Sequence, residues 1–309
     1  MKAAQEPHVQ NPSPAAKWDL GVARRALDEL FRLAREYKST TQYRELLDFV
    51  GRFRFYSPYN AMLIHTQMPG AVYVAPPHRW LDQYRRRIKP GARPLIILQP
   101  MGPVMFVFDV SETEPEQGAP PLPSEIERPF EIREGQLGGE LGKTIENAKR
   151  DGVRITKRDA GSQDAGEIHG AVGERYVAFQ IKQRPEPEYE SVRVRYELLL
   201  NSQLSAAATY ATLVHELGHL YCGHLGTLNP KWWPDRRGLS RELREFEAES
   251  VCYLLCSRLG IDNPSAEYLS GYVKNHENTP TISLECVIKS AGLIEQMGRE
   301  RLKPRKEKE

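Results

Sequence analysis

The chain contains few cysteines for its length, only four among 309 residues, and none of them forms a Cys-x-x-Cys pair. A small secreted protein held together by disulfides carries many more, so we expect reduced thiols that mostly fill the core. Long apolar runs are also missing: no stretch approaches the length of a membrane span, and the N-terminus lacks a signal-peptide core. These absences argue against a disulfide scaffold and a membrane protein, and we expect a cytoplasmic protein.

The net charge is only +2, but it is unevenly distributed. Residues 1–100 contain 16 Lys and Arg against 8 Asp and Glu, whereas residues 101–150 contain 5 against 10. The stretch that follows residue 110 is acidic, rich in proline and without a periodic apolar pattern, which is typical of a linker. We therefore predict two α+β domains, arranged as a loose N-terminus (1–16), a smaller basic domain (17–110), a linker (111–128), a larger domain (129–300) and a charged tail (301–309).

Two imidazoles and a carboxylate occur close together in the sequence His215-Glu216-Leu217-Gly218-His219. Residues 206–222 are rich in alanine, Ser205 can cap their N-terminus and Gly223 can end them, so we predict a helix there. His215 and His219 then lie one turn apart on the same face, and two nitrogens can bind one Zn²⁺ ion. A catalytic zinc site needs a third protein ligand and a base, for which Glu216 is the candidate.

A second predicted helix, residues 240–256, offers the third ligand. Glu242, Glu245 and Glu249 recur on one face, which Cys252 and Cys256 continue with small apolar side chains. An acidic stripe that becomes apolar suits a helix packed against a metal better than a solvated face. We interpret Glu245 as the ligand and Glu249 as the acceptor for the outer N–H of a ligand histidine, while Glu242 is equally well a surface charge.

These two helices resemble the zincin-like peptidase domain of the ImmA/IrrE metallopeptidases. That family pairs His-Glu-x-x-His with Glu-x-x-Ala on a downstream helix, and Glu245 to Ala248 match the second element. The resemblance implies helices packed on a small mixed sheet, a gluzincin-like Zn²⁺ site of His215, His219 and Glu245, and Glu216 as the base. Where many members have asparagine after the alanine, this chain has Glu249, which is closer to the antirestriction proteins of the ArdC type.

The N-terminal half also resembles the ArdC-like N-terminal domain, which is associated with single-stranded DNA binding; the similarity lies in residues 59–65, 75–80 and 88–98. Cations alternate with rings nearby, so that guanidinium groups can hold phosphates while rings stack on unpaired bases. The candidate residues are Arg52, Arg54, Tyr56, Arg79, Trp80, Arg85 and Arg86. The same pattern also fits amphipathic elements whose aromatic side chains face the core.

The sequence therefore predicts a zinc-dependent metalloendopeptidase that cleaves a cytoplasmic protein, such as a repressor, and carries a single-stranded-DNA-binding domain. The alternative is a non-enzymatic antirestriction-type protein that binds single-stranded DNA and uses zinc mainly to stabilise its fold. Glu216 favours the first hypothesis, because a structural zinc site needs no base beside its ligands. Residues 176–182 and 191–201 are predicted strands, and the edge strand of such a sheet can bind an extended peptide.

Overall fold

The computed structural model of the chain describes residues 39–99, 102–123, 126, 137–159, 165–261, 265–275 and 280–305. Within these ranges, helices and short strands mix along the chain, which confirms the predicted α+β class. The N-terminus predicted to be loose, residues 1–16, lies outside the described ranges, as do residues 306–309 of the predicted tail.

The described ranges form eight α-helices: α2 (Thr40–Arg52), α3 (Pro58–Gln67), α4 (Pro77–Tyr84), α6 (Glu140–Ala148), α7 (Ala206–Tyr221), α8 (Arg241–Leu259), α9 (Ser265–Asn275) and α10 (Leu284–Arg299). Serine side chains cap the N-termini of α2, α3, α7, α8 and α10, each accepting a backbone N–H from three residues ahead. Such a cap satisfies a donor that the helix itself leaves unpaired, which explains where these helices begin. None of the described helices is both long and apolar enough to cross a membrane.

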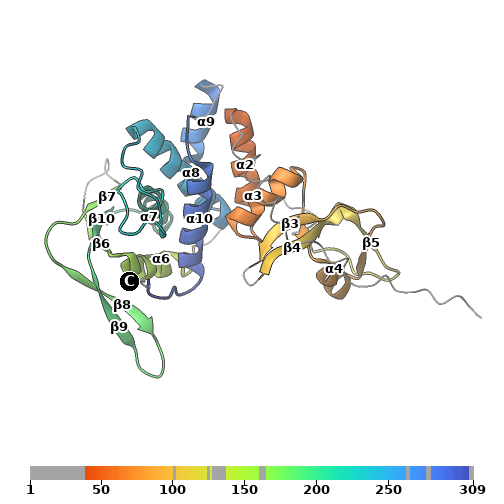
Figure 1. Cartoon of the computed structure of the whole chain (residues 1–309), viewed down its shortest axis with the longest axis horizontal. Helices are drawn as coiled ribbons and strands as arrows, with labels where there is room; N and C mark the ends of the chain where they lie inside the picture. Colours follow the sequence, from red (N-terminus) through yellow and green to blue (C-terminus); the bar gives the residue numbers. More distant parts are fainter. Residues whose placement is uncertain are drawn as a thin grey trace, which may run out of the picture.

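The strands of the described ranges form four small sheets, with strand orders β1-β4-β3, β6-β10-β7, β2-β5 and β8-β9. Their bounds are β1 (Val74–Ala75), β2 (Arg86–Ile88), β3 (Leu95–Gln99), β4 (Gly102–Asp109), β5 (Thr113–Pro115), β6 (Val153–Arg158), β7 (Gly166–Gly170), β8 (Tyr176–Lys182), β9 (Glu188–Arg193) and β10 (Tyr196–Asn201). Two short 3-10 turns, η1 (Val110–Glu112) and η2 (Lys149–Asp151), precede β5 and β6. In Figure 1 the β8-β9 hairpin extends away from the helices, and α4 and β5 lie at the opposite end of the molecule.

The sheet that matters for the candidate site is β6-β10-β7. Strand β10 lies in its centre, parallel to β6 and antiparallel to β7, with Leu198 opposite both Ile155 and Ile168. Most of β10 is buried, as expected for an apolar central strand. Strand β7 is an edge of this mixed sheet and packs against α7.

The prediction of one strand over residues 191–201 is wrong, whereas the strand predicted at 176–182 is confirmed as β8. The structure divides residues 191–201 between β9 and β10 because the chain changes partners at Val194 and Arg195. Strand β9 pairs with β8 in the hairpin, and β10 pairs with β6 and β7 in the mixed sheet. The alternating and the apolar parts of this sequence thus belong to two different sheets.

One apolar core connects the first described helices to the last. Val50 of α2, Ile64 of α3, Leu213 of α7, Leu254 of α8 and Ile294 of α10 are all buried in the same cluster. Helix α2 packs against α8, and α3 packs against α10, as Figure 1 shows. The division at residues 111–128 into two domains stays a prediction, but α2 and α3 share the core of the C-terminal helices.

Part of the segment predicted as a linker is regular structure instead. Thr113 begins strand β5, which pairs antiparallel with β2, and its Oγ1 accepts a hydrogen bond of 2.8 Å from Arg86. Further along, Ile126 is buried in a second, smaller core beside Tyr73 and Trp80. Short strands of this kind carry too few residues for a period to be visible in the sequence.

Candidate metal centre

Helix α7 carries the His-Glu-x-x-His motif and has the bounds predicted for it to within one residue. Its alanine-rich start is capped by Ser205, whose Oγ accepts the backbone N–H of Ala208 at 3.2 Å. After the helix, Gly223 adopts φ +85°, where an added Cβ atom would lie 2.1 Å from the carbonyl oxygen of Pro234. Glycine is therefore required for the chain to leave the helix at this point.

Small residues allow α7 and α8 to approach each other closely beside the motif. A Cβ atom added to Gly218 would lie 3.3 Å from the Cα atom of Ala248, which leaves little room for a side chain between the helices. Ala248 lies about one turn after Glu245 on α8. As a result, Glu245 of α8 faces His215 and His219 of α7.

The donor atoms of His215, His219 and Glu245 converge. The two Nε2 atoms lie 3.2 Å apart, and each lies 3.6 Å from Oε2 of Glu245. A tetrahedral Zn²⁺ ion with ligands at about 2.0–2.1 Å holds its donor atoms about 3.3 Å apart. The observed triangle has nearly these edges, and two imidazoles with one carboxylate suit a divalent cation. The structure thus brings together the three residues predicted as ligands.

Glu216 lies beside these donors and is 9% exposed. Burial raises the pKa of its carboxyl group to about 7, against the lowering effects of His215 and of a backbone hydrogen bond from Ile168 in β7. A carboxylate with a pKa near neutrality can both accept and return a proton. Glu216 can therefore exchange a proton near neutral pH beside the three donors.

Charges within the cluster strongly shift its histidines and Glu245. Burial alone would lower the pKa of His215, but Glu245, Glu249 and Glu216 outweigh it and raise this pKa to about 9. Burial and the neighbouring His215 lower the pKa of His219, so His219 is neutral at pH 7. The two adjacent imidazoles hold the pKa of Glu245 well below its usual range. Without metal, the proton on His215 thus takes the place of the cation and balances the charge of Glu245.

The affinity for Zn²⁺ should rise with pH, because the cation has to displace the proton from His215. Below the His215 pKa of about 9, each binding event releases this proton, so the dissociation constant should fall about tenfold per pH unit between pH 6.5 and 8.5. Competition with a chelator of known proton affinity measures the slope. A dissociation constant that stays the same over this range would contradict the assignment.

The other glutamates of α8 differ in their positions. Oε1 of Glu249 lies 3.8 Å from Nδ1 of His215, a close charge contact on the outer side of the ring. This is the side on which the sequence predicts a supporting acceptor, although the distance exceeds that of a hydrogen bond. Glu242 is exposed to solvent, as expected for a surface charge.

Two solved structures resemble the chain weakly. Both are crystal structures of the antirestriction protein ArdC from plasmid R388, one metal-free and one with Mn(II) bound. They are 14% and 13% identical to this chain, cover 79% and 78% of it and 85% and 84% of the ArdC chain, and have TM-scores of 0.33 and 0.31. No protein-family model and no curated protein matches the sequence. The interpretation of the site therefore rests on its own geometry.

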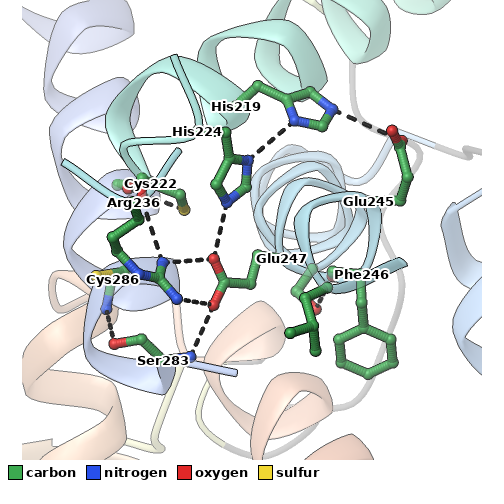
Figure 2. A network of polar contacts seen from close by, with 12 residues as sticks. His219, Cys222, His224, Arg236, Glu245, Phe246, Glu247, Ser283 and Cys286 are labelled. Carbon is green, nitrogen blue, oxygen red and sulfur yellow. Dashed lines mark hydrogen bonds and ion pairs between the residues drawn. The ribbon is translucent and has the colours of Figure 1, made fainter. Parts of the chain in front are cut away.

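Three residues behind the ligands were not predicted as part of the site. His224 contacts His219, Glu247 contacts His224, and Arg236 forms an ion pair with Glu247 (Figure 2). Glu247 is on the face of α8 opposite the acidic stripe, and the other two residues lie outside regular helices. The sequence held one signal for Glu247, which stands between the apolar residues Phe246 and Ala248. All three residues are buried in the structure, and a buried carboxylate needs partners.

The residues predicted to bind nucleic acid around α2 have other partners within the protein. Arg54 donates to the backbone carbonyl of Ser257, and the hydroxyl of Tyr56 donates to that of Val74. The guanidinium of Arg52 lies over the ring of Phe49, 5.1 Å from its centre. The contact of Arg52 lies within α2, whereas those of Arg54 and Tyr56 hold the segment that follows α2 against α8 and β1.

Around α4, the structure requires a correction at Trp80. The side chain is fully buried, packs edge-on against Tyr73, and donates its indole N–H to the carbonyl of Phe108 at 2.9 Å. A ring enclosed in this way has no free face for a base, so Trp80 has a structural role. Arg86 donates to Thr113, and Arg85, although exposed, donates to the carbonyl of Gly118 at 3.3 Å. Arg79 is exposed.

Proposed function

We propose that this protein is a zinc-dependent peptidase with a zincin-like active site. His215, His219 and Glu245 would hold the ion, and Glu216 would act as the base. The observation that carries the proposal is the convergence of three donor atoms beside a buried carboxylate, contributed by two helices that pack closely. When bound, Zn²⁺ would polarise a carbonyl group and lower the pKa of water to about 7.

The chain itself supplies proton transfer at this site. Glu216 would take a proton from the attacking water and deliver it to the leaving amine, and a pKa of about 7 suits both steps. The backbone N–H of Ile168 holds this carboxylate from the side of β7. No covalent intermediate with the protein is needed.

Strand β7 favours a peptide as the substrate. It is an edge of the mixed sheet, packs against α7, and reaches Glu216 through Ile168. An extended peptide that adds to this edge would lie across the metal centre, with its backbone hydrogen-bonded by the strand. We propose an extended segment of a regulatory protein as the substrate class.

The geometry gives less support to the non-enzymatic alternative. A structural zinc site is closed by four protein ligands, whereas the described part of the chain offers three at this cluster. A buried base beside the ligands also has no role in such a site. Single-stranded DNA as an additional partner stays a prediction, and Arg79 and Arg85 are its exposed candidate residues.

Substitution Glu216→Gln tests this proposal, because it removes the base but leaves the ligands in place. We expect one Zn²⁺ per chain in both proteins, and hydrolysis slower by about 10²- to 10⁴-fold in the variant. Elemental analysis and a quenched fluorescent peptide library measure the two quantities. Glu242→Gln, an exposed glutamate on α8, is the matched control and should behave as wild type. Full activity in Glu216→Gln would refute the mechanism, and a wild-type protein without bound metal would refute the centre.

A further inference from the structure

A buried series of polar contacts lies behind the metal-binding nitrogen of His219. Nδ1 of His219 lies 3.0 Å from Nδ1 of His224, and Nε2 of His224 lies 2.9 Å from Oε2 of Glu247. The side chains of His224 and Glu247 are 1% and 0% exposed, so bulk water does not compete for these contacts. Figure 2 shows His219 between Glu245 on one side and His224 on the other.

Glu247 can only accept hydrogen bonds in this arrangement. Its two oxygens each accept a hydrogen bond of 2.6 Å from the guanidinium of Arg236, and Oε1 also accepts the backbone N–H of Ser283 at 2.7 Å. A buried carboxylate with these donors stays ionised. The atom of His224 that contacts it must therefore carry a proton.

The remaining proton positions follow from this end of the series. When Nε2–H of a neutral His224 donates to Glu247, its Nδ1 atom has no proton and can only accept. The contact of 3.0 Å between the two Nδ1 atoms then requires His219 to donate. His219 is left with an unprotonated Nε2, the atom that faces His215 and Glu245 and that a cation requires.

We infer that His224 and Glu247 are positioning residues for the metal centre. They hold His219 in the Nδ1–H tautomer and orient its ring so that Nε2 points at the other two ligands. The inference deepens the proposed function and rests on it, since it assigns the support behind one of the three ligands. Losing such support typically weakens metal binding about 10- to 100-fold.

A second cation site in the same place does not fit the contacts. Donor atoms of Cys222, His224 and Glu247 lie within 4.8 Å of one another. However, Arg236 already places a positive charge on both oxygens of Glu247. Burial also raises the pKa of the Cys222 thiol, so it stays protonated and is a poor ligand. This cluster therefore supports His219 and holds no ion of its own.

Two near-isosteric substitutions separate positioning from simple packing. In His224→Asn, the side-chain oxygen can replace Nδ1 as the acceptor for His219, while the contact with Glu247 is lost. In His224→Gln, the amide N–H₂ can reach Glu247, while the acceptor for His219 is lost. Both variants disturb the buried core to a similar degree, so a merely structural role predicts equal effects. His78→Gln, an exposed histidine on α4, is the control.

The experiment measures Zn²⁺ affinity by chelator competition and the His219 tautomer by ¹⁵N NMR of the metal-free, full-length protein. We expect the Nδ1–H tautomer in wild type and His224→Asn, and its loss in His224→Gln together with about 10- to 100-fold weaker Zn²⁺ binding. Wild-type affinity in His224→Gln, or equal weakening in both variants with an unchanged tautomer, would overturn the inference.

The tautomer of the wild-type protein decides the matter even if neither variant folds, because an Nε2–H form of His219 contradicts the proton positions directly. The same measurement separates this inference from the proposed function. Absence of Zn²⁺ binding in wild type would refute the metal centre, whereas an Nε2–H tautomer in a protein that binds Zn²⁺ would refute only the role of His224 and Glu247.

Discussion

Purified Glu245→Gln should contain less than about 0.1 Zn²⁺ per chain, whereas Glu249→Gln should retain the ion with an affinity reduced about 10- to 100-fold. Within the part of the chain that the structure describes, Glu245 supplies the only anionic donor that converges with both imidazoles, at 3.6 Å from each Nε2 atom. Its neutral amide would be a weak ligand, and the cation would keep only two strong donors. Glu249 contacts only the outer nitrogen of His215, at 3.8 Å.

The pair of variants is informative because the two residues are one turn apart on α8 and undergo the same chemical change. Elemental analysis after gel filtration gives the metal content, and thermal unfolding of the metal-free proteins shows whether the fold is intact. Glu242→Gln, on the same acidic stripe but exposed, should bind Zn²⁺ like wild type. The opposite result, in which Glu249→Gln loses the ion and Glu245→Gln keeps it, would exchange the two roles.

The sequence predicted the two helices of the site well, because their signals are local. The predicted cap Ser205 accepts a backbone N–H at the start of α7, because a capping signal depends on a few neighbouring residues. A spacing of four residues on a helix also determines that His215 and His219 share a face. To predict that they converge with Glu245, it was enough to expect that α7 and α8 pack against each other.

The support behind the ligands was not predictable in the same way. His224 lies in the turn after α7, Arg236 in the connection to α8 and Glu247 on the far face of α8, and no regular spacing relates them. Their contacts depend on the path of the connecting loop, which is fixed by the exit at Gly223. Tertiary geometry of this kind leaves no period in a sequence.

In the N-terminal half, the residue pattern alone could not show which arginines and rings lie on the surface. Arginines interleaved with rings predict a nucleic-acid surface and an amphipathic element equally well, and burial decides between them. The structure buries Trp80 and engages Arg54, Tyr56 and Arg86 with backbone or side-chain partners. Arg54 and its partner Ser257, for example, are 203 residues apart, so the sequence alone does not reveal their hydrogen bond.

Replacing Arg258 by Met should lower the free energy of unfolding by about 3–5 kcal/mol, the largest stability effect that we predict. The side chain of Arg258, on α8, is 1% exposed and forms an ion pair of 2.6 Å with Glu295 of α10. It also donates to the backbone carbonyls of Val50 and Phe53 at the end of α2, at 2.7 and 3.0 Å. Its loss would leave the largely buried Glu295 carboxylate with the exposed Arg299 as its remaining partner, and the carbonyls at the end of α2 would lose this donor.

Arg299→Met provides the matched control, because Arg299 contacts the same carboxylate of Glu295 from a side chain that is 55% exposed. Its loss should change stability by no more than about 1 kcal/mol, as is usual for exposed ion pairs. Urea unfolding of the metal-free proteins compares the variants. The double variant Arg258→Met with Glu295→Leu should be less destabilised than Arg258→Met alone, since it also removes the carboxylate that has lost its buried partner. A single variant within about 1 kcal/mol of wild type would contradict this account.

Arg258 also connects this stability to the metal centre. Arg258 lies near the C-terminal end of α8, and Glu245 lies in the second turn of the same helix. The contacts of Arg258 with α2 and α10 therefore help to fix the position of α8. If α8 is held mainly by this ion pair, Arg258→Met should weaken Zn²⁺ binding even under conditions where the variant is folded. Arg299→Met, which keeps the buried contact intact, should not. Equal Zn²⁺ affinities in folded Arg258→Met and wild type would show that α7 alone fixes the position of Glu245 through the close contact at Gly218.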